Sequence, residues 1–236
     1  MKKTDLERIK TEAKAFLHLD YQVAERLSPV LFVHHPFLTS VMAYDTQTKE
    51  FIDIREDEAL HKYRQQMIQQ IDRCDLRRLY IMVNKPYRLT FIKYIESHLS
   101  ERDFAELLSD AWVSSENPNQ DVNCSITCLT RMFKRCNKRY LMSNRDYKVY
   151  NSLPEQFTIY RGVAVGHNPD GLSWTQNKDK ATWFASRFNT DYEKGYLLTT
   201  VIDKSDVLAY FNTRGEEEIL VNANAKKYIK ERIELD

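Results

Sequence analysis

The sequence predicts an α+β fold in which a helix-rich N-terminal region, residues 1–152, precedes a strand-rich core, residues 153–236. Up to about residue 153, long segments carry apolar residues at helical spacing; after it, short β-type runs such as FTIYRGV, GYLLTTVI and EEILVNA alternate with turns. The chain has 236 residues, of which 42% are hydrophobic and only five are glycine. These values fit one compact domain with a sizeable N-terminal extension, or one domain of two unequal lobes.

The N-terminal region is predicted to consist of successive amphipathic helices and one short β segment. Ser100 and Asp103 have the spacing of a capping box, which predicts a helix start at this point. The stretch SSENPNQD, residues 114–121, is the clearest break. Helical spacing covers residues 4–28 with Thr4 as the cap, 56–78, 89–99, 100–112 and 122–140, and β-branched and aromatic residues mark a β segment at about 29–54.

Charge and hydropathy exclude several classes of protein. The formal net charge is +1, so no overall field attracts nucleic acid or membrane surfaces, and such contacts require a local patch. The N-terminus MKKTDLERIKTEAKAF lacks the apolar segment of a signal peptide, and no run approaches the roughly 18 apolar residues of a membrane span. The sequence therefore predicts a soluble, cytoplasmic protein.

Cysteines and histidines give little support for a metal site. Cys124, Cys128 and Cys136 would lie on one helical face, but no histidine is near them, which favours free thiols in a reducing compartment. His34 and His35 are adjacent, so on a strand they would face opposite ways and could not easily chelate one ion. The sequence predicts no metal.

Three short motifs follow one another within the last 80 residues. The first is Phe157-Thr-Ile-Tyr-Arg161-Gly162, a strand that ends in arginine and glycine. The second is Gly171-Leu-Ser173-Trp-Thr175, followed by a helix, KDKATWFASRF. The third is Arg214-Gly-Glu216-Glu-Glu218-Ile-Leu-Val, in which acidic residues lead into an apolar strand. Each motif alone is common as a surface turn or strand end, so the interpretation depends on their order and spacing.

This order of arginine, serine and glutamate resembles the R-S-E type of mono-ADP-ribosyltransferase, the toxin-like and arginine-specific branch of that family. The resemblance covers residues 157–222, and more loosely the helical segments before them, where TFIKYIESHLSERDFAELLSDAW, SSENPN and KRYLM resemble leaders in phage and bacterial proteins of this type. It implies a split antiparallel β-sandwich with NAD, the co-substrate, in its cleft. No Gly-x-Gly-x-x-Gly follows a strand, which argues against a Rossmann dehydrogenase.

The resemblance assigns roles to the motif residues. Cleavage of the nicotinamide–ribose bond leaves positive charge on the ribose, which a fixed carboxylate, Glu218, would stabilise. Glu216, expected on the same strand face, would orient or activate the acceptor, whereas Glu217 would point away and be dispensable. Ser173 would hold Glu218 and the ribose in register. The predicted catalytic residues are therefore Glu218, Glu216 and Ser173.

The same resemblance implies a set of NAD-binding residues. Arg161 offers a charged fork for the pyrophosphate or its ribose, and Gly162 allows close backbone approach to the nicotinamide amide. Thr175 would assist or would only cap the following helix, and His167 lies where a cleft loop is expected. Candidates for stacking on the nicotinamide are Trp174, Phe184 and Tyr192, with Phe184 and Trp183 alternatively part of the core.

The acceptor of the ADP-ribose stays open between RNA and protein. The Glu-x-Glu form is associated in the family with arginine acceptors on proteins. A basic stretch argues instead for a nucleic-acid acceptor, because on a helix its side chains would share roughly one face and could contact a phosphate backbone. The alternative is an ordinary solvated helix face. The residues of this stretch are Arg131, Lys134, Arg135, Lys138 and Arg139.

The family also implies a biological setting. It includes phage-linked bacterial toxins, among them a group that modifies mRNA in phage defence and is restrained by an antitoxin protein. We therefore expect an intracellular toxin of phage defence or of a toxin–antitoxin system. The alternatives are an NAD glycohydrolase that depletes NAD, and a catalytically inactive binding module of the same fold.

Overall fold

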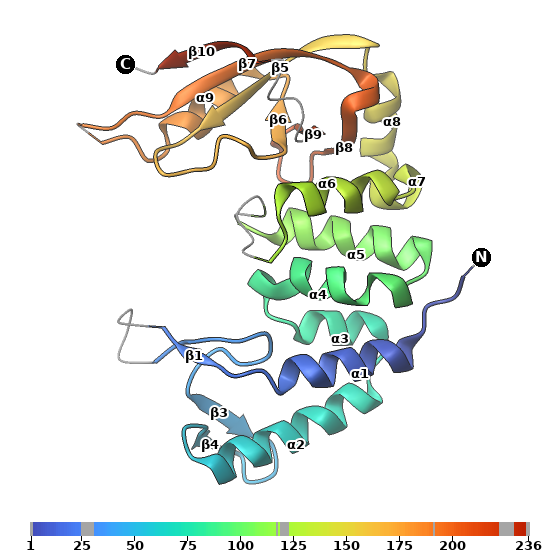
Figure 1. The fold of residues 1–236 in the computed structure, drawn as a ribbon, viewed down its shortest axis with the longest axis vertical. Coiled ribbons are helices and arrows are strands. Elements are labelled where there is room, and N and C mark those ends of the chain that lie inside the picture. The colour runs from blue at the N-terminus through green and yellow to red at the C-terminus, as the bar shows by residue number, and fades with distance from the viewer. Residues whose placement is uncertain are drawn as a thin grey trace. The chain divides into compact units, whose positions relative to one another are not determined.

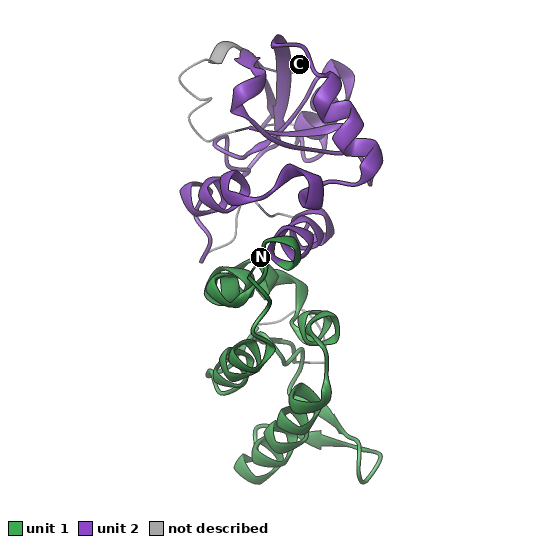
Figure 2. Cartoon of the chain, turned by 90° about the vertical axis from the view of Figure 1, so that its right-hand side faces the viewer, with its two compact units in different colours: residues 1–103 green, residues 104–236 purple. Residues whose placement is uncertain are grey.

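The structure, a computed structural model, describes residues 2–24, 31–116, 118, 123–190, 192–221 and 229–234. The chain forms two compact units, residues 1–103 and 104–236 (Figure 2). Both contain helices and strands, and the second contains a six-stranded antiparallel sheet. The predicted mixture of helix and sheet is therefore confirmed.

The first unit is mainly helical, with two small β ribbons. Strands β1 and β2 pair antiparallel, as do β3 and β4. A small apolar cluster of Val33, Leu38, Val41, Ala43 and Ile54 packs beneath them. Its elements are α1 (Leu6–Leu17), β1 (Gln22–Val23), β2 (Val33–His34), β3 (Met42–Asp45), β4 (Glu50–Asp53), α2 (Asp57–Arg73), α3 (Leu76–Met82), η1 (Lys85–Tyr87), α4 (Arg88–Ile95) and η2 (Glu96–His98).

Helix α1 is shorter than the helix predicted over residues 4–28. Its cap is Asp5, whose carboxylate accepts a hydrogen bond from the backbone N–H of Arg8 at 3.1 Å. The helix ends at Leu17, where the buried apolar spacing stops, and β1 begins at Gln22; residues 25–28 lie outside the described part of the chain. The predicted cap Thr4 instead accepts a hydrogen bond from the N–H of Ser100 at 2.8 Å. The capping prediction for Ser100 is confirmed, because its hydroxyl accepts from the N–H of Asp103 at 3.1 Å.

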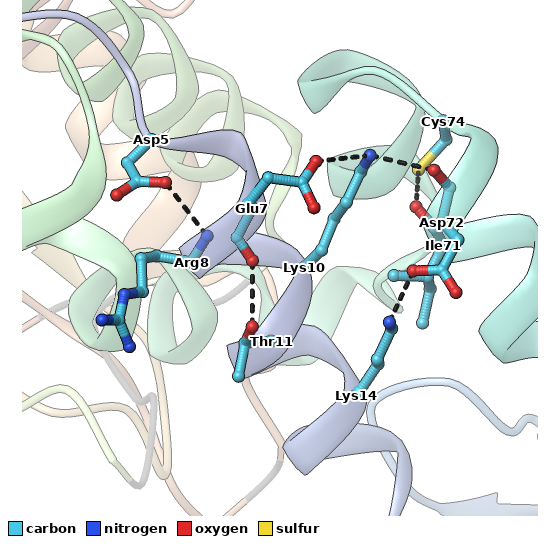
Figure 3. A network of polar contacts seen from close by, with 9 residues as sticks. All are labelled: Asp5, Glu7, Arg8, Lys10, Thr11, Lys14, Ile71, Asp72 and Cys74. Atoms are coloured by element: carbon cyan, nitrogen blue, oxygen red, sulfur yellow. Dashed lines mark hydrogen bonds and ion pairs between the residues drawn. The ribbon is translucent and has the colours of Figure 1, made fainter.

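Two lysines of α1 tie this helix to the end of α2 (Figure 3). Lys10, only 8% exposed, donates to the backbone carbonyl of Asp72 at 2.9 Å and to the carboxylate of Glu7 at 3.1 Å. Lys14 forms an ion pair with the Asp72 carboxylate at 2.5 Å. The carbonyls of a helix's last turn lack partners within the helix. Lys10 therefore satisfies one such group of α2 while its aliphatic stem is buried.

In its described part, the second unit combines the helices α5 to α9 with the six-stranded sheet. Helices that precede the strands in sequence belong to the same compact unit as the strands, and α6 and α8 contact β8. The described elements are α5 (Glu101–Ser114), α6 (Ile126–Arg135), α7 (Lys138–Leu141), α8 (Asn144–Ser152), β5 (Gln156–Val163), β6 (Ser173–Thr175), α9 (Lys178–Ser186), β7 (Tyr196–Asp203), η4 (Lys204–Asp206), β8 (Val207–Phe211), β9 (Glu218–Val221) and β10 (Ile229–Glu234).

The sheet of the second unit, labelled in the upper part of Figure 1, consists of two three-stranded halves. Its strand order is β10-β7-β5-β6-β9-β8. Strand β5 pairs with β7 along its whole length, and all three residues of β6 pair with β9. Between β5 and β6, however, the register contains one pair, Tyr160 with Thr175. The two three-stranded halves are therefore joined at a single position, and they can diverge on either side of it.

The helix predicted over residues 122–140 is interrupted. Helix α6 ends at Arg135, because Cys136 has extended backbone angles, φ −67° and ψ 137°. Asn137 then caps α7, its side chain accepting from the N–H of Arg139 at 3.0 Å. Residue 122 lies outside the described ranges. None of the helices in the described ranges is both long enough and apolar enough to cross a membrane.

His35 generates a prediction on stability. Its side chain is 1% exposed, its Nδ1 accepts from the N–H of Phe37 at 3.0 Å, and burial, together with the charge of Arg64, lowers the pKa to about 4 from 6.5. The unfolded chain therefore binds a proton below pH 6.5 that the folded chain does not bind until about pH 4, so this contribution to stability is complete above pH 6.5 and is lost as the pH falls toward 4. We expect the free energy of unfolding of the wild type, relative to His35→Asn, to decrease by up to about 3 kcal/mol over this interval.

Urea unfolding at several pH values measures this difference. Asparagine can still accept from the Phe37 N–H but does not titrate. His34→Asn is the matched control, because His34 is exposed and should leave the pH dependence unchanged. A constant difference between wild type and His35→Asn from pH 4 to 7 would contradict the prediction.

Candidate active site

A pocket in the second unit lies beside the junction of β5 and β6. Both members of the joining pair, Tyr160 and Thr175, line it. The pocket contains members of all three sequence motifs. The lining residues are Glu116, Pro118, Tyr160, Arg161, Gly162, Ala164, His167, Asn168, Ser173, Trp174, Thr175, Ala181, Phe184, Arg187, Phe188, Arg214, Glu216 and Glu218.

Glu218 is a buried carboxylate at the start of β9. Its side chain is 7% exposed, and it lies opposite Thr175 of β6. The indole N–H of Trp112, on α5, donates to its Oε1 at 3.2 Å, and Ser173 also hydrogen-bonds to it. Burial raises the pKa of Glu218 above its ordinary value, although the hydrogen bonds of Ser173 and Trp112 oppose this effect. Glu218 is therefore held in place by donors from two elements and has an elevated pKa.

Arg161 lies within β5, two residues before its end, and connects this strand to β6. Its Nη1 donates to the carbonyl of Ser173 at 2.7 Å and its Nη2 to the carbonyl of Asn168 at 2.8 Å. Burial lowers the pKa of Arg161 to about 10, opposed by the charge of Glu218, so the guanidinium stays charged at neutral pH. Its terminal nitrogens, predicted to form a fork for a ligand, are used here to hold the loop and β6.

Gly171 lies against the guanidinium of Arg161. A Cβ at Gly171 would lie 2.2 Å from the Arg161 Nη2. The guanidinium therefore packs directly on the backbone of residue 171, which fixes the course of the loop leading into β6.

Gly162 allows α9 to pack on β5. A Cβ at this position would lie 1.9 Å from the carbonyl oxygen of Ala181 and 2.6 Å from the backbone nitrogen of Ala185. Gly195 makes a similar contact, 2.0 Å from the carbonyl oxygen of Ala185. Glycine was predicted here to allow close approach of a ligand, and in the structure it allows close approach of the α9 backbone. Gly162 also lines the pocket.

The acidic motif begins in a turn and not in a strand. Gly215 and Glu217 have positive φ values of 72° and 52°, and β9 starts only at Glu218. The prediction that Glu216 and Glu218 share a strand face is therefore wrong, because the left-handed residue between them breaks the alternation. Glu216 nevertheless lines the pocket, where its carboxylate accepts from Nη2 of Arg214 at 2.8 Å. Glu217 lies outside the pocket lining and pairs with Lys180 at 3.2 Å.

Thr175 connects the pocket to the start of α9. Its hydroxyl accepts from the N–H of Asn177 at 3.1 Å, and Asn177 caps α9 by accepting from the N–H of Lys180 at 3.1 Å. The cap of α9 is therefore Asn177, so the alternative prediction that Thr175 caps this helix is wrong, and Thr175 contacts the cap residue instead. Its side chain is also buried at the pocket wall.

The aromatic residues predicted to stack on the nicotinamide differ in their exposure and in whether they line the pocket. Phe184 lines the pocket and is partly exposed, whereas Trp174 lines it but is only 5% exposed. Tyr192 is 96% exposed and is not part of the lining. Trp183, considered above as a core residue, is 57% exposed, so that alternative is wrong. His167 lines the pocket and stacks on Phe188, with ring centroids 5.4 Å apart.

The basic stretch does not form one helical face, because the chain is extended at Cys136. Arg131, Lys134, Arg135 and Arg139 are exposed. The guanidinium of Arg135 lies 4.2 Å from the ring centroid of Phe104, and that of Arg139 lies 5.2 Å from that of Tyr147. Lys138 is partly buried and donates to the carbonyls of Phe133 and Leu208.

No group of three or more histidine, cysteine, aspartate or glutamate side chains among the described residues is placed to hold a metal ion. The four cysteines are free thiols, and Cys74, Cys124 and Cys136 are buried. His34 is exposed and His35 is buried, so these two side chains face opposite ways as expected.

Trp112 contacts the site residue Glu218 but was not predicted from the sequence. It is fully buried, and its ring meets that of Phe133 edge-on, with centroids 5.2 Å apart. A tryptophan at a buried helical position looks like any core residue in the sequence, and its contact with Glu218 spans 106 positions. Arg214 and Arg187, which also line the pocket, were equally missed, although Arg214 belongs to the third motif.

Comparisons of the chain with protein-family models, with curated proteins and with solved structures give no match. The functional interpretation therefore depends on the geometry of the pocket and on the motif resemblance.

The close packing of α9 gives a prediction. Gly162→Ala places a methyl group within the van der Waals radius of the α9 backbone, so we expect the free energy of unfolding to fall by about 1–3 kcal/mol or more. Urea unfolding followed by circular dichroism measures it. Gly166→Ala is the control: its φ is +75° but no atom lies within 4 Å, so only backbone strain of about 1–2 kcal/mol is expected. Equal losses for the two variants would show that the helix contact does not matter.

Proposed function

We propose that the chain is a mono-ADP-ribosyltransferase that uses NAD as co-substrate and needs no metal. The observation that carries the proposal is the meeting of Arg161, Ser173 and Glu218 in one pocket, with Glu218 buried and hydrogen-bonded. These residues come from three separated motifs, and their joint placement is what the resemblance requires. The single pair between β5 and β6 also supports the proposed split sheet of this type.

The residues of the pocket fit the chemistry of the dinucleotide. NAD supplies a glycosidic bond whose cleavage develops positive charge on the ribose. Glu218 is the carboxylate that would stabilise that charge, and Ser173 and Trp112 fix its orientation so that little reorganisation is needed. Arg161 and Arg214 line the pocket with positive charge suited to a pyrophosphate.

Glu216 is the proposed acceptor-orienting group. It lines the pocket from the turn before β9, where it forms an ion pair with Arg214 at 2.8 Å. Phe184 is the aromatic residue we favour for stacking on the nicotinamide, because it lines the pocket from α9 and is partly exposed. Gly162 and Thr175 complete the wall beside it.

The proposed biological role is that of a cytoplasmic toxin in phage defence or in a toxin–antitoxin system. This role follows from the resemblance alone. An adjacent gene for a binding antitoxin protein would support it.

Labelled NAD tests the reaction. The protein is incubated with NAD labelled in the adenylate, and label is counted in separated RNA, DNA and protein fractions while nicotinamide is measured. Label in one macromolecular fraction supports transfer. Nicotinamide release without label in any fraction would identify an NAD glycohydrolase, and neither signal would favour an inactive binding module.

Glu218→Gln is expected to lower the rate of nicotinamide release about 10²–10³-fold, because the amide cannot supply the negative charge. Glu217→Gln is the matched control: Glu217 is adjacent to Glu218 in sequence but pairs with Lys180 and lies outside the pocket lining, so the rate should be unchanged. Equal rates for wild type and Glu218→Gln would remove Glu218 from the mechanism.

Trp112→Phe isolates the indole hydrogen bond. A hydrogen bond to the ionised form of Glu218 lowers its pKa, so removal should raise that pKa further. We expect the acid limb of the pH–rate profile to move to higher pH, with a loss of rate of about tenfold at neutral pH. Phe133→Leu is the control, because it alters the packing of Trp112 without removing its N–H. An identical shift in both variants would assign the effect to packing.

A further inference from the structure

Exposed large hydrophobic residues of the second unit are concentrated in one short segment. Within its described part, the large hydrophobic side chains that are exposed are Trp183, Phe188 and Tyr192, at 57%, 49% and 96%. All three are aromatic. Trp183 lies in α9, and Phe188 and Tyr192 lie in the segment that follows this helix. By contrast, Ala181 and Ala185 on the opposite side of α9 are buried against the sheet. Folding alone does not explain this exposure, since burial of such rings is favourable.

The exposed rings form an ordered set with a cation between them. The Cζ of Arg187 lies 5.2 Å from the ring centroid of Trp183 and 5.3 Å from that of Phe188. Phe188 also stacks on His167, with centroids 5.4 Å apart and planes inclined by 8°. We call His167, Phe188, Arg187 and Trp183 the α9 strip. Its members are flat groups, each held against the next.

The α9 strip is continuous with the candidate active site. His167, Phe188 and Arg187 line the pocket, whereas Trp183 does not. The strip therefore starts at the pocket wall and ends on an exposed ring outside it. A molecule bound along it would have one end beside the pocket.

We propose that the α9 strip binds the bases of a single-stranded nucleic acid. Exposed aromatic faces bind bases of any sequence by stacking, and an interleaved arginine adds a stacking plane and a positive charge for the phosphate backbone. Surfaces that dock proteins are also enriched in aromatic residues and arginine, so composition alone does not choose between the two kinds of partner. The planar groups of His167, Phe188 and Arg187 follow one another as stacked bases of a single strand do, and this arrangement favours bases as the ligand. The base-stacking site is thus the part of the chain that selects a nucleic-acid acceptor over a protein.

The basic stretch of α6 and α7 is the weaker candidate for this contact. Its Arg135 lies over Phe104, a ring that is only 1% exposed, and its Arg139 over the partly buried Tyr147, whereas Arg187 lies over rings that are 57% and 49% exposed. Lys138 donates to backbone carbonyls. The α9 strip still offers free ring area. Its role as an acceptor site depends on the proposed function, but its affinity for single strands does not.

Tryptophan fluorescence provides a direct test without NAD. The chain has three tryptophans, of which Trp112 and Trp174 are 0% and 5% exposed, so quenching by an added ligand reports mainly on Trp183. A single-stranded oligoribonucleotide of mixed sequence is expected to quench the emission saturably. Inorganic polyphosphate, which has charge but no bases, is expected to quench little; equal quenching and equal affinity for polyphosphate would overturn the proposal.

Substitutions of Trp183 test whether the affinity for the oligoribonucleotide comes from the α9 strip. By anisotropy of a labelled oligoribonucleotide, Trp183→Leu should weaken binding about tenfold, and Trp183→Phe, which keeps a ring face, should restore most of it. Tyr94→Leu is the matched control, since Tyr94 is also 57% exposed and lies beside a cation, Lys93, at 5.7 Å. Unchanged affinity in Trp183→Leu, or an equal loss in Tyr94→Leu, would overturn the proposal.

The last measurement separates this inference from the proposed function. Saturable binding lost in Trp183→Leu supports the inference even if no NAD is cleaved. Cleavage of NAD with no measurable oligoribonucleotide binding would contradict the inference and leave the proposed function intact. Transfer of label to protein that falls in Trp183→Leu, without RNA binding, would instead make the α9 strip a protein-docking surface and overturn the proposal.

Discussion

Burial of the Glu218 carboxylate is the constraint on which the second unit depends. The next three residues, Ile219, Leu220 and Val221, are at most 1% exposed, so this acid begins a fully buried strand. Removing a carboxylate from water is costly unless hydrogen bonds or opposite charge compensate. Here the compensation comes from Trp112 on α5 and Ser173 on β6, with Arg161 as the nearby cation. Helix α5 must therefore pack with the sheet, which gives a physical reason for finding α5 to α8 in the same compact unit as the strands.

A second consequence of burial concerns Arg161 and the few glycines. A buried guanidinium needs acceptors, and it obtains them from the carbonyls of Ser173 and Asn168. A side chain at residue 171 would overlap the guanidinium in this position and would have to displace it. Gly162 and Gly195 similarly accept the backbone of α9. Thus three of five glycines serve close approach around the pocket, which accounts for glycine at these positions in a chain where it is scarce.

Sequence reasoning anticipated what local patterns encode. The strands around Arg161, Ser173 and Glu218 were predicted from β-type runs, and the helix after Ser173 from its composition. The extent of α1 and the break at Cys136 were missed, because apolar spacing was extended past the point where the buried residues stop. The side-chain cap by Asn137 was the overlooked signal for a new helix. Alternation failed for Glu216 because a positive φ at Glu217 is not visible in a run of three glutamates. The contact of Trp112 with Glu218 arises only from tertiary packing.

Helix α9 has one face packed on the sheet beside the pocket and another face that carries exposed aromatic residues. Its buried face, at Ala181 and Ala185, is seated on glycine positions of the sheet, which leaves little freedom to rotate or slide. Its exposed face carries Trp183, and the residues after it carry Arg187 and Phe188 into the pocket lining. The packing of α9 on these glycines therefore determines both the pocket wall and the position of the aromatic groups relative to Glu218. If the strip holds a strand of nucleic acid, its distance from the buried carboxylate is determined by backbone packing and not by mobile side chains. A fixed spacing of this kind restricts which atoms of a bound acceptor can reach the ribose, so acceptor choice would depend on the same glycines that build the site.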